Sequence, residues 1–121
     1  ERDFTYIDDI VESLIRILDK PAKPDNLFDK SNPNPSTSWA PYRIFNIGNS
    51  KPTPLIDYIN AIESELGLNA KKLFKPIQPG DVPATESDSS ELESWIKFKP
   101  NTSIKNGIKE FIKWYKDFYG Y

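Results

Sequence analysis

The stretch "YRIFNIGNSKPTPLIDYINAIE", residues 42–63, indicates the fold because its hydrophobic pattern changes period partway along. Its first part is a β-branched and aromatic run typical of a strand. Thr53 and Pro54 then predict an N-cap and a first helical residue, and apolar residues recur at helical spacing until Gly67. Residues 4–18 show the same order. Two strand-then-helix units in succession predict a right-handed crossover between parallel strands.

The elements on either side of this stretch follow from similar signals. In the first unit, Asp8 and Asp9 are placed to cap a helix that ends before Lys20 and Pro21. Residues 72–77 alternate in polarity and predict a third strand, at a sheet edge because a proline interrupts it.

Two more helices are expected toward the C-terminus. The first is short, begins at Asp88 or Ser89 and runs to Ile96. The second begins at Thr102 or Ser103. Its lysines should face solvent, and its predicted inward-facing residues are Ile104, Ile108, Phe111, Ile112 and Tyr115.

Residues 21–42 predict a long loop, because they carry five prolines and clusters of Asn, Asp and Ser. The length of 121 residues suits one domain, spanning residues 1–121. The expected fold class is therefore a small mixed α/β domain of about four helices and three to four short strands.

Composition excludes several function classes. The net charge of -2 with scattered lysines argues against nucleic-acid binding. No apolar run reaches the roughly 18 residues of a membrane span, so a soluble protein is expected. The absence of Cys and His removes Ser-His-Asp and Cys-His catalysis and most zinc sites, and no metal site is expected. The chain has no Met and begins where a strand is under way, so we expect a piece of a longer protein.

The remaining residues offer little cofactor or acid-base chemistry. The five glycines lie too far apart for a phosphate-binding loop, and no tyrosine has a lysine four residues later. Acidic pairs such as Asp8 and Asp9 or Glu91 and Glu93 fit exposed helix starts better than catalysis. No catalytic or cofactor-binding residue is therefore expected in this chain.

Four ordered blocks carry a resemblance to a known family. They are "RDFTYIDDIVE" at 2–12, the stretch at 42–63, "PIQPGDVPATESD" at 76–88 and the closing "FKPNTSIKNGIKEFIKWYKDFY". Together they resemble the C-terminal part of extended short-chain dehydrogenase/reductase nucleotide-sugar epimerases, most like the UDP-glucuronate 4-epimerase branch. The resemblance implies the substrate-holding portion of an extended short-chain dehydrogenase/reductase fold without its Rossmann domain.

The resemblance also implies a function. The full-length protein would be a cytoplasmic, NAD-dependent, homodimeric 4-epimerase of polysaccharide biosynthesis that interconverts UDP-glucuronate and UDP-galacturonate. NAD would bind the missing N-terminal Rossmann domain, which is the expected partner of this portion. This chain would bind the UDP-sugar, would hold no cofactor and would not turn over alone.

The resemblance assigns three residues to the substrate. Arg2, in the "RDF" motif, would contact the pyrophosphate, and a guanidinium suits a diphosphate because its fixed fork donates two charge-assisted bonds. Asp81, after Gly80, would accept from the two ribose hydroxyls. Gln78 stands where many relatives carry a phosphate-binding arginine, so its contribution on the phosphate side is expected to be weak.

Two alternatives stay open. One is a stand-alone binding or scaffold module that has lost the cofactor domain. The other is the C-terminal part of a related nucleotide-sugar dehydratase or decarboxylase, since such enzymes share the nucleotide-binding end and differ around the sugar.

Overall fold

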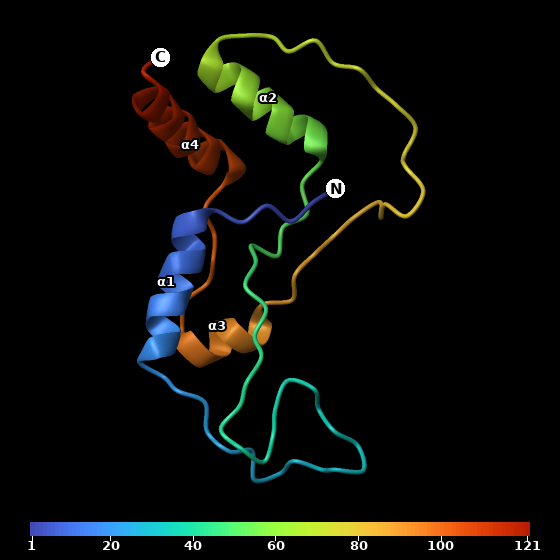
Figure 1. Ribbon diagram of the computed structural model, residues 1–121, viewed down its shortest axis with the longest axis vertical. Coiled ribbons are helices and arrows are strands. Elements are labelled where there is room, and N and C mark those ends of the chain that lie inside the picture. The colour runs from blue at the N-terminus through green and yellow to red at the C-terminus, as the bar shows by residue number, and fades with distance from the viewer.

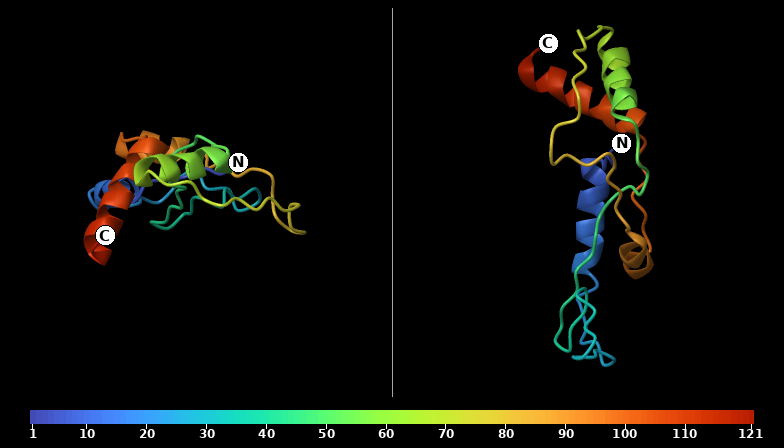
Figure 2. Two further views of the ribbon diagram at one scale, coloured as in Figure 1. Left: turned by 90° about the horizontal axis from the view of Figure 1, so that it is seen from above. Right: turned by 90° about the vertical axis from the view of Figure 1, so that its right-hand side faces the viewer.

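The computed structural model describes residues 1–121, and all its regular structure is helical. The helices pack as two pairs, α1 with α3 and α2 with α4, which follow one another along the long axis of an elongated molecule (Figures 1 and 2). Their bounds are Ile7–Leu18 for α1, Leu55–Leu66 for α2, Ser90–Ile96 for α3 and Ile104–Tyr119 for α4.

The expected mixed α/β fold is wrong, because the chain forms four helices and no strand. The expected strands at 4–7, 43–48 and 72–77 are extended segments without a ladder, apart from the residue that opens α1. Pairing is limited to two isolated bridges, Arg2 with Thr53 and Thr37 with Arg43. Both bridges are antiparallel, so the predicted parallel crossover is also wrong.

Where the extended segments meet, the Asp3 carboxylate accepts hydrogen bonds that a neighbouring strand would otherwise accept. A β-branched run becomes a strand only when its backbone N–H and C=O groups pair along a neighbour. Here the Asp3 carboxylate accepts from the N–H groups of Ser50, Lys51 and Ser87, at 3.0, 3.2 and 3.0 Å. These backbone N–H groups are hydrogen-bonded without a β-ladder, so the alternating sequence pattern predicted strands that do not form.

The helices themselves follow the sequence signals closely. Gly67 ends α2 with a φ of 68°, a left-handed conformation that glycine adopts without steric cost. Ser103 caps α4 by accepting from the Asn106 N–H. The predicted caps Thr53 and Asp9 do not cap, because the residues that precede α2 and α1 are Pro54 and Tyr6.

Asp9 has a different role, as a buried tie between α1 and the start of α4. Its side chain is largely hidden, and its carboxylate accepts from the backbone N–H groups of Asn101 and Thr102 at 3.2 and 2.9 Å. A buried carboxylate is tolerated when hydrogen bonds replace its water. Asp9, the second residue of the acidic pair, therefore stabilises the fold by joining α1 to the start of α4.

The hydrophobic core is small. Its four buried large apolar residues are Leu92, Ile96, Ile108 and Ile112. Of the five residues predicted to face inward on α4, Ile108 and Ile112 are buried, but Phe111 and Tyr115 stay 46% and 37% exposed. Only 12 of the 121 residues are buried, so much apolar surface has no partner within the chain.

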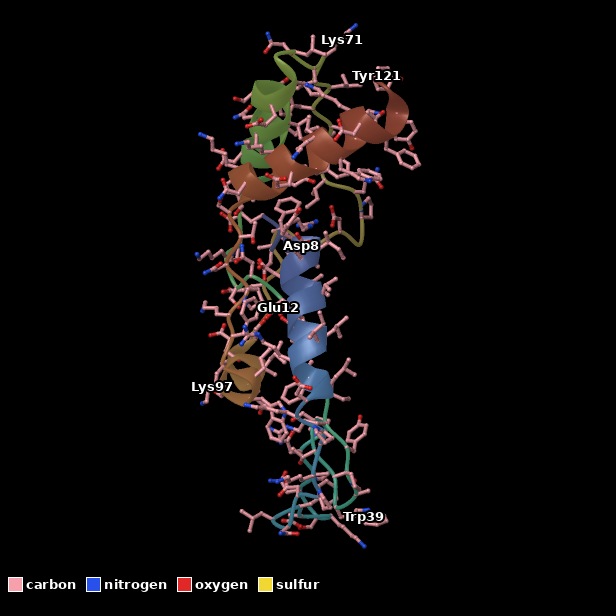
Figure 3. All side chains as sticks on the ribbon, turned by 90° about the vertical axis from the view of Figure 1, so that its left-hand side faces the viewer. Asp8, Glu12, Trp39, Lys71, Lys97 and Tyr121 are labelled. Atoms are coloured by element: carbon pink, nitrogen blue, oxygen red, sulfur yellow. The ribbon has the colours of Figure 1, made fainter.

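Two long connections contain no helix. The Pro-rich loop at residues 21–42 extends beyond α1 and forms one end of the molecule, and Trp39 and Tyr121 lie toward opposite ends (Figure 3). The chain then runs back past α3 to α2 (Figure 1). Residues 67–89 form the other connection, a wide arc between α2 and α3 (Figure 1). None of the four helices combines the length and apolar character that a membrane span requires.

Candidate functional site

The segment from Pro76 to Thr85 makes a tight turn around one carboxylate. The Asp81 N–H donates to the Gln78 carbonyl at 3.1 Å, and the Val82 N–H donates to Asp81 Oδ1 at 2.9 Å. Gly80 has a φ of 88°, where a residue with a Cβ would be strained. The turn therefore sets where the Asp81 side chain points.

Arg2 reaches this turn from the other end of the sequence. Its Nη2 donates to Asp81 Oδ1 at 2.7 Å, forming an ion pair between residues 79 positions apart. Its Nη1 donates to the Val82 carbonyl at 2.9 Å and to the Glu1 carbonyl at 2.8 Å. The structure thus brings together two of the three residues singled out from the sequence.

The third of these residues, Gln78, is not joined to the pair. Its backbone carbonyl helps to form the turn, but its side chain makes no hydrogen bond and the residue is exposed. It lies beside the ion pair in sequence, without contacting Arg2 through a hydrogen bond.

A rigid base holds Arg2 in place. Its backbone exchanges two hydrogen bonds with Thr53, at 3.0 and 2.9 Å. The next residue is Asp3, whose carboxylate gathers the turn at residues 49–51 and the N–H of Ser87. Asp3 was missed from the sequence, because nothing in the pattern around it, between Arg2 and Phe4, marks it as a hydrogen-bond acceptor for distant segments.

Gly48 packs against Ser87 and Asp3 so closely that only a residue without a side chain fits there. A Cβ at this glycine would lie 2.4 Å from Ser87 Cβ and 3.1 Å from Asp3 Oδ2. Asn46 adds a weaker tie, since its side-chain amide donates to the Asp88 carbonyl at 3.3 Å. Asn46 and Gly48 therefore stabilise the packing of this segment against residues 87 and 88.

The ion pair leaves donors and an acceptor free at the surface. Arg2 Nε and Asp81 Oδ2 make no hydrogen bond, and the two side chains are 33% and 50% exposed. A guanidinium N–H can donate to an anion, and a carboxylate oxygen can accept from hydroxyl groups. The pair can therefore bind a ligand that carries an anionic group next to hydroxyls.

An apolar groove lies elsewhere in the molecule. It encloses about 230 Å³ between the N-terminal segment and helices α2 and α4, and its lining includes Phe4, Tyr58, Gly107 and Phe111. Phe4 stacks on Tyr58 with ring centroids 4.2 Å apart. Neither Arg2 nor Asp81 lines it, so the candidate site is an open surface rather than an enclosed cavity.

Comparison with known proteins gives two kinds of match, although no family model matches the chain. Protein CapI of Staphylococcus aureus is 45% identical over 118 residues, which are 98% of this chain and 35% of CapI. UDP-glucuronate 4-epimerase 1 of Arabidopsis thaliana is 38% identical over 121 residues, 99% of this chain and 27% of that enzyme. The chain thus spans about a third of the length of these relatives.

The second match is structural. The crystal structure of UDP-glucose 4-epimerase from Bifidobacterium longum in complex with NAD+ and UDP superposes with a TM-score of 0.69 over 95% of this chain and 30% of that protein. At 19% sequence identity, this match concerns the fold.

The sequence relatives include UDP-glucuronate 4-epimerases, a class of nucleotide-sugar epimerase, and the solved structure shares the fold. Within that class, the chain is homologous to the C-terminal part of UDP-glucuronate 4-epimerases, which confirms the resemblance expected from the sequence.

Proposed function

We propose that this chain is the substrate-holding portion of an NAD-dependent nucleotide-sugar 4-epimerase that, when complete, interconverts UDP-glucuronate and UDP-galacturonate. The observation that carries the proposal is the meeting of Arg2 and Asp81, far apart in sequence, at one exposed turn of a chain related to UDP-glucuronate 4-epimerases. Both the anionic and the hydroxyl-rich part of a UDP-sugar find a matching group there.

In this proposal the nucleotide bridges the two side chains. Arg2 donates to the pyrophosphate through its free Nε–H, and Asp81 accepts from the ribose hydroxyls on its free Oδ2. Gln78 precedes Asp81 in the same segment and adds a weak polar contact on the phosphate side. These residues bind and orient the substrate, and none of them transfers the hydride.

The glycines of this chain do not fit NAD. Gly48 packs against Ser87, Gly107 lies inside α4 against the Tyr6 ring, and the other three have left-handed φ at helix ends or at the Asp81 turn. A dinucleotide site needs closely spaced glycines, in the pattern G-x-G-x-x-G, at the start of a helix. We therefore assign NAD to the remaining two-thirds of the epimerase.

The remaining part of the epimerase is also the partner we assign to the exposed face of α1. Ile7, Val11, Leu14, Ile15 and Leu18 line this helix and are 45–80% exposed. An apolar face of this size normally packs against another element. The proposal includes a cytoplasmic homodimer whose subunit contacts lie outside this chain, and an isolated chain without turnover.

Product analysis tests the proposed reaction. The complete protein, supplied with UDP-glucuronate and NAD, should yield UDP-galacturonate. A 4-keto-6-deoxy sugar or a pentose would show instead that the parent is a dehydratase or a decarboxylase.

Calorimetry on the isolated chain tests the stand-alone alternative. UDP-sugar binding should be weak or undetectable, because part of the pocket and its preorganisation are absent. Micromolar affinity that disappears in Asp81→Ala would favour an independent binding module.

A further inference from the structure

The hydrogen bonds of the Arg2 side chain beyond its own neighbour all go to the Asp81 turn. Nη2 contacts the Asp81 carboxylate, and Nη1 contacts the carbonyl of Val82 and, at 3.5 Å, that of Pro83. One guanidinium therefore binds three consecutive residues, one through its side chain and two through their backbone. These contacts hold the backbone of residues 81–83 in place and also pair with the Asp81 carboxylate.

Little else holds this turn to the rest of the molecule. Every residue from 67 to 86 is exposed, and between 73 and 86 the hydrogen bonds to the rest of the chain come from Glu1 and Arg2. Earlier in the connection, Ala70 and Lys72 are tied to Glu63. The position of Asp81 thus depends on contacts at its own turn.

Some polar atoms of the ion pair hold the turn, and others stay free to bind a ligand. Asp81 Oδ1 is occupied by Arg2 and by the Val82 N–H, whereas Oδ2 is free. On Arg2, the Nη1 and Nη2 groups hold the turn, and Nε is free. A ligand can therefore bind while the pair stays intact.

We propose that Arg2 is a positioning residue for Asp81: it latches the turn so that Oδ2 faces the ribose, in addition to donating to the pyrophosphate. This inference rests on the proposed function and deepens it. The ligand it selects is a nucleoside diphosphate with an intact ribose diol. The latch makes a distinct prediction, since removing Arg2 should weaken recognition of a nucleoside that has no phosphate at all.

The first test concerns the latch itself and needs no ligand. In the 15N-labelled chain, Arg2→Ala should lower the heteronuclear NOE of residues 79–85 and leave that of α4 unchanged. Arg2→Lys should restore part of it, because an ammonium can pair with Asp81 but cannot also bridge the two carbonyls. The control is Arg16→Ala, which removes an exposed arginine paired with Glu12. Unchanged NOE values in Arg2→Ala would overturn the latch.

The second test, on the complete protein, compares uridine with 2′-deoxyuridine at millimolar concentration, read from the amide shifts of residues 79–85. Wild type and Arg16→Ala should respond more to uridine, and Arg2→Ala should lose this preference. If Asp81→Asn loses the preference while Arg2→Ala keeps it, the positioning role is wrong and the ribose assignment stands. If wild type shows no preference, the ribose assignment fails, and the NOE comparison still decides the latch.

Discussion

Close packing around Asp3 and Gly48 shows how much of this fold depends on single residues. Asp3 joins three separate segments through backbone N–H groups, and Gly48 admits Ser87 at a distance that no side chain would allow. The same segments carry Arg2 and lead into Asp81. Stability and site geometry therefore depend on the same few residues, which are testable one at a time.

Replacing Gly48 with alanine should destabilise the chain. The added Cβ would clash with Ser87 Cβ at 2.4 Å, and forcing a methyl group into a packed place costs about 1–3 kcal/mol. Thermal unfolding of Gly48→Ala should therefore occur at a lower temperature. The matched control is the double variant with Ser87→Gly, which removes the clashing atom and should recover much of the loss. Equal stability of Gly48→Ala and wild type would contradict this packing.

Replacing Asp3 with asparagine should also be costly. The carboxylate accepts three backbone N–H groups with its two oxygens, whereas an amide has one oxygen and leaves at least one N–H group without its partner, the N–H groups of Ser50 and Ser87 being half-buried. The expected loss in the free energy of unfolding is about 1–3 kcal/mol, measured by urea denaturation. Asp117→Asn, on the exposed side of α4, should change stability little. A similar small effect in Asp3→Asn would show that the carboxylate is dispensable.

Sequence patterns predicted the helices well and the strands badly, for a physical reason that can be located. Helix signals are local, and Gly67 and Ser103 act at the helix ends as expected. Strand formation needs a partner along the run, and residues 43–48 have only one isolated bridge, at Arg43. Arg2 and Asp81 were selected by resemblance to a family. Their direct ion pair could not be predicted, because it depends on how residues far apart in sequence fold back.

The end of α2 should respond to acid through Glu63. Hydrogen bonds from Lys72 and from the Ala70 N–H lower the pKa of this carboxyl below its usual value of 4.5. A lowered folded-state pKa means that the stabilisation is present above the unfolded pKa and is lost as pH falls through the folded one. The tie of residues 70–72 to α2 should therefore weaken below about pH 4.5.

Amide shifts of Ala70 and the Glu63 carboxyl resonance, followed from pH 6 to pH 2.5, measure this directly. Glu63→Gln should show no corresponding step at Ala70. A Glu63 titration midpoint at or above the usual value would contradict the tie.

Across the molecule as a whole, α1 presents an apolar face that no other part of this chain covers. Leu14 is 51% exposed in the middle of this face. We expect the isolated chain to self-associate at high concentration, because apolar surface without its natural partner associates with itself. Leu14→Glu should reduce this association without changing helix content, as judged by sedimentation velocity and circular dichroism.

The control is Leu27→Glu, since Leu27 is 91% exposed in the loop beyond α1 and should not affect association. A wild-type chain that sediments as a monomer across concentrations would show that the face of α1 is not adhesive.

If Arg2 and Asp81 hold the nucleotide, the affinity of the complete protein for UDP depends on both side chains. Charge-assisted hydrogen bonds contribute about 1.5–3 kcal/mol, so Asp81→Ala should weaken UDP binding by roughly tenfold to a hundredfold in calorimetry. Asp25→Ala, in the distant loop at residues 21–42, should bind UDP like wild type. Equal affinities of Asp81→Ala and Asp25→Ala for UDP would show that Asp81 does not bind the nucleotide.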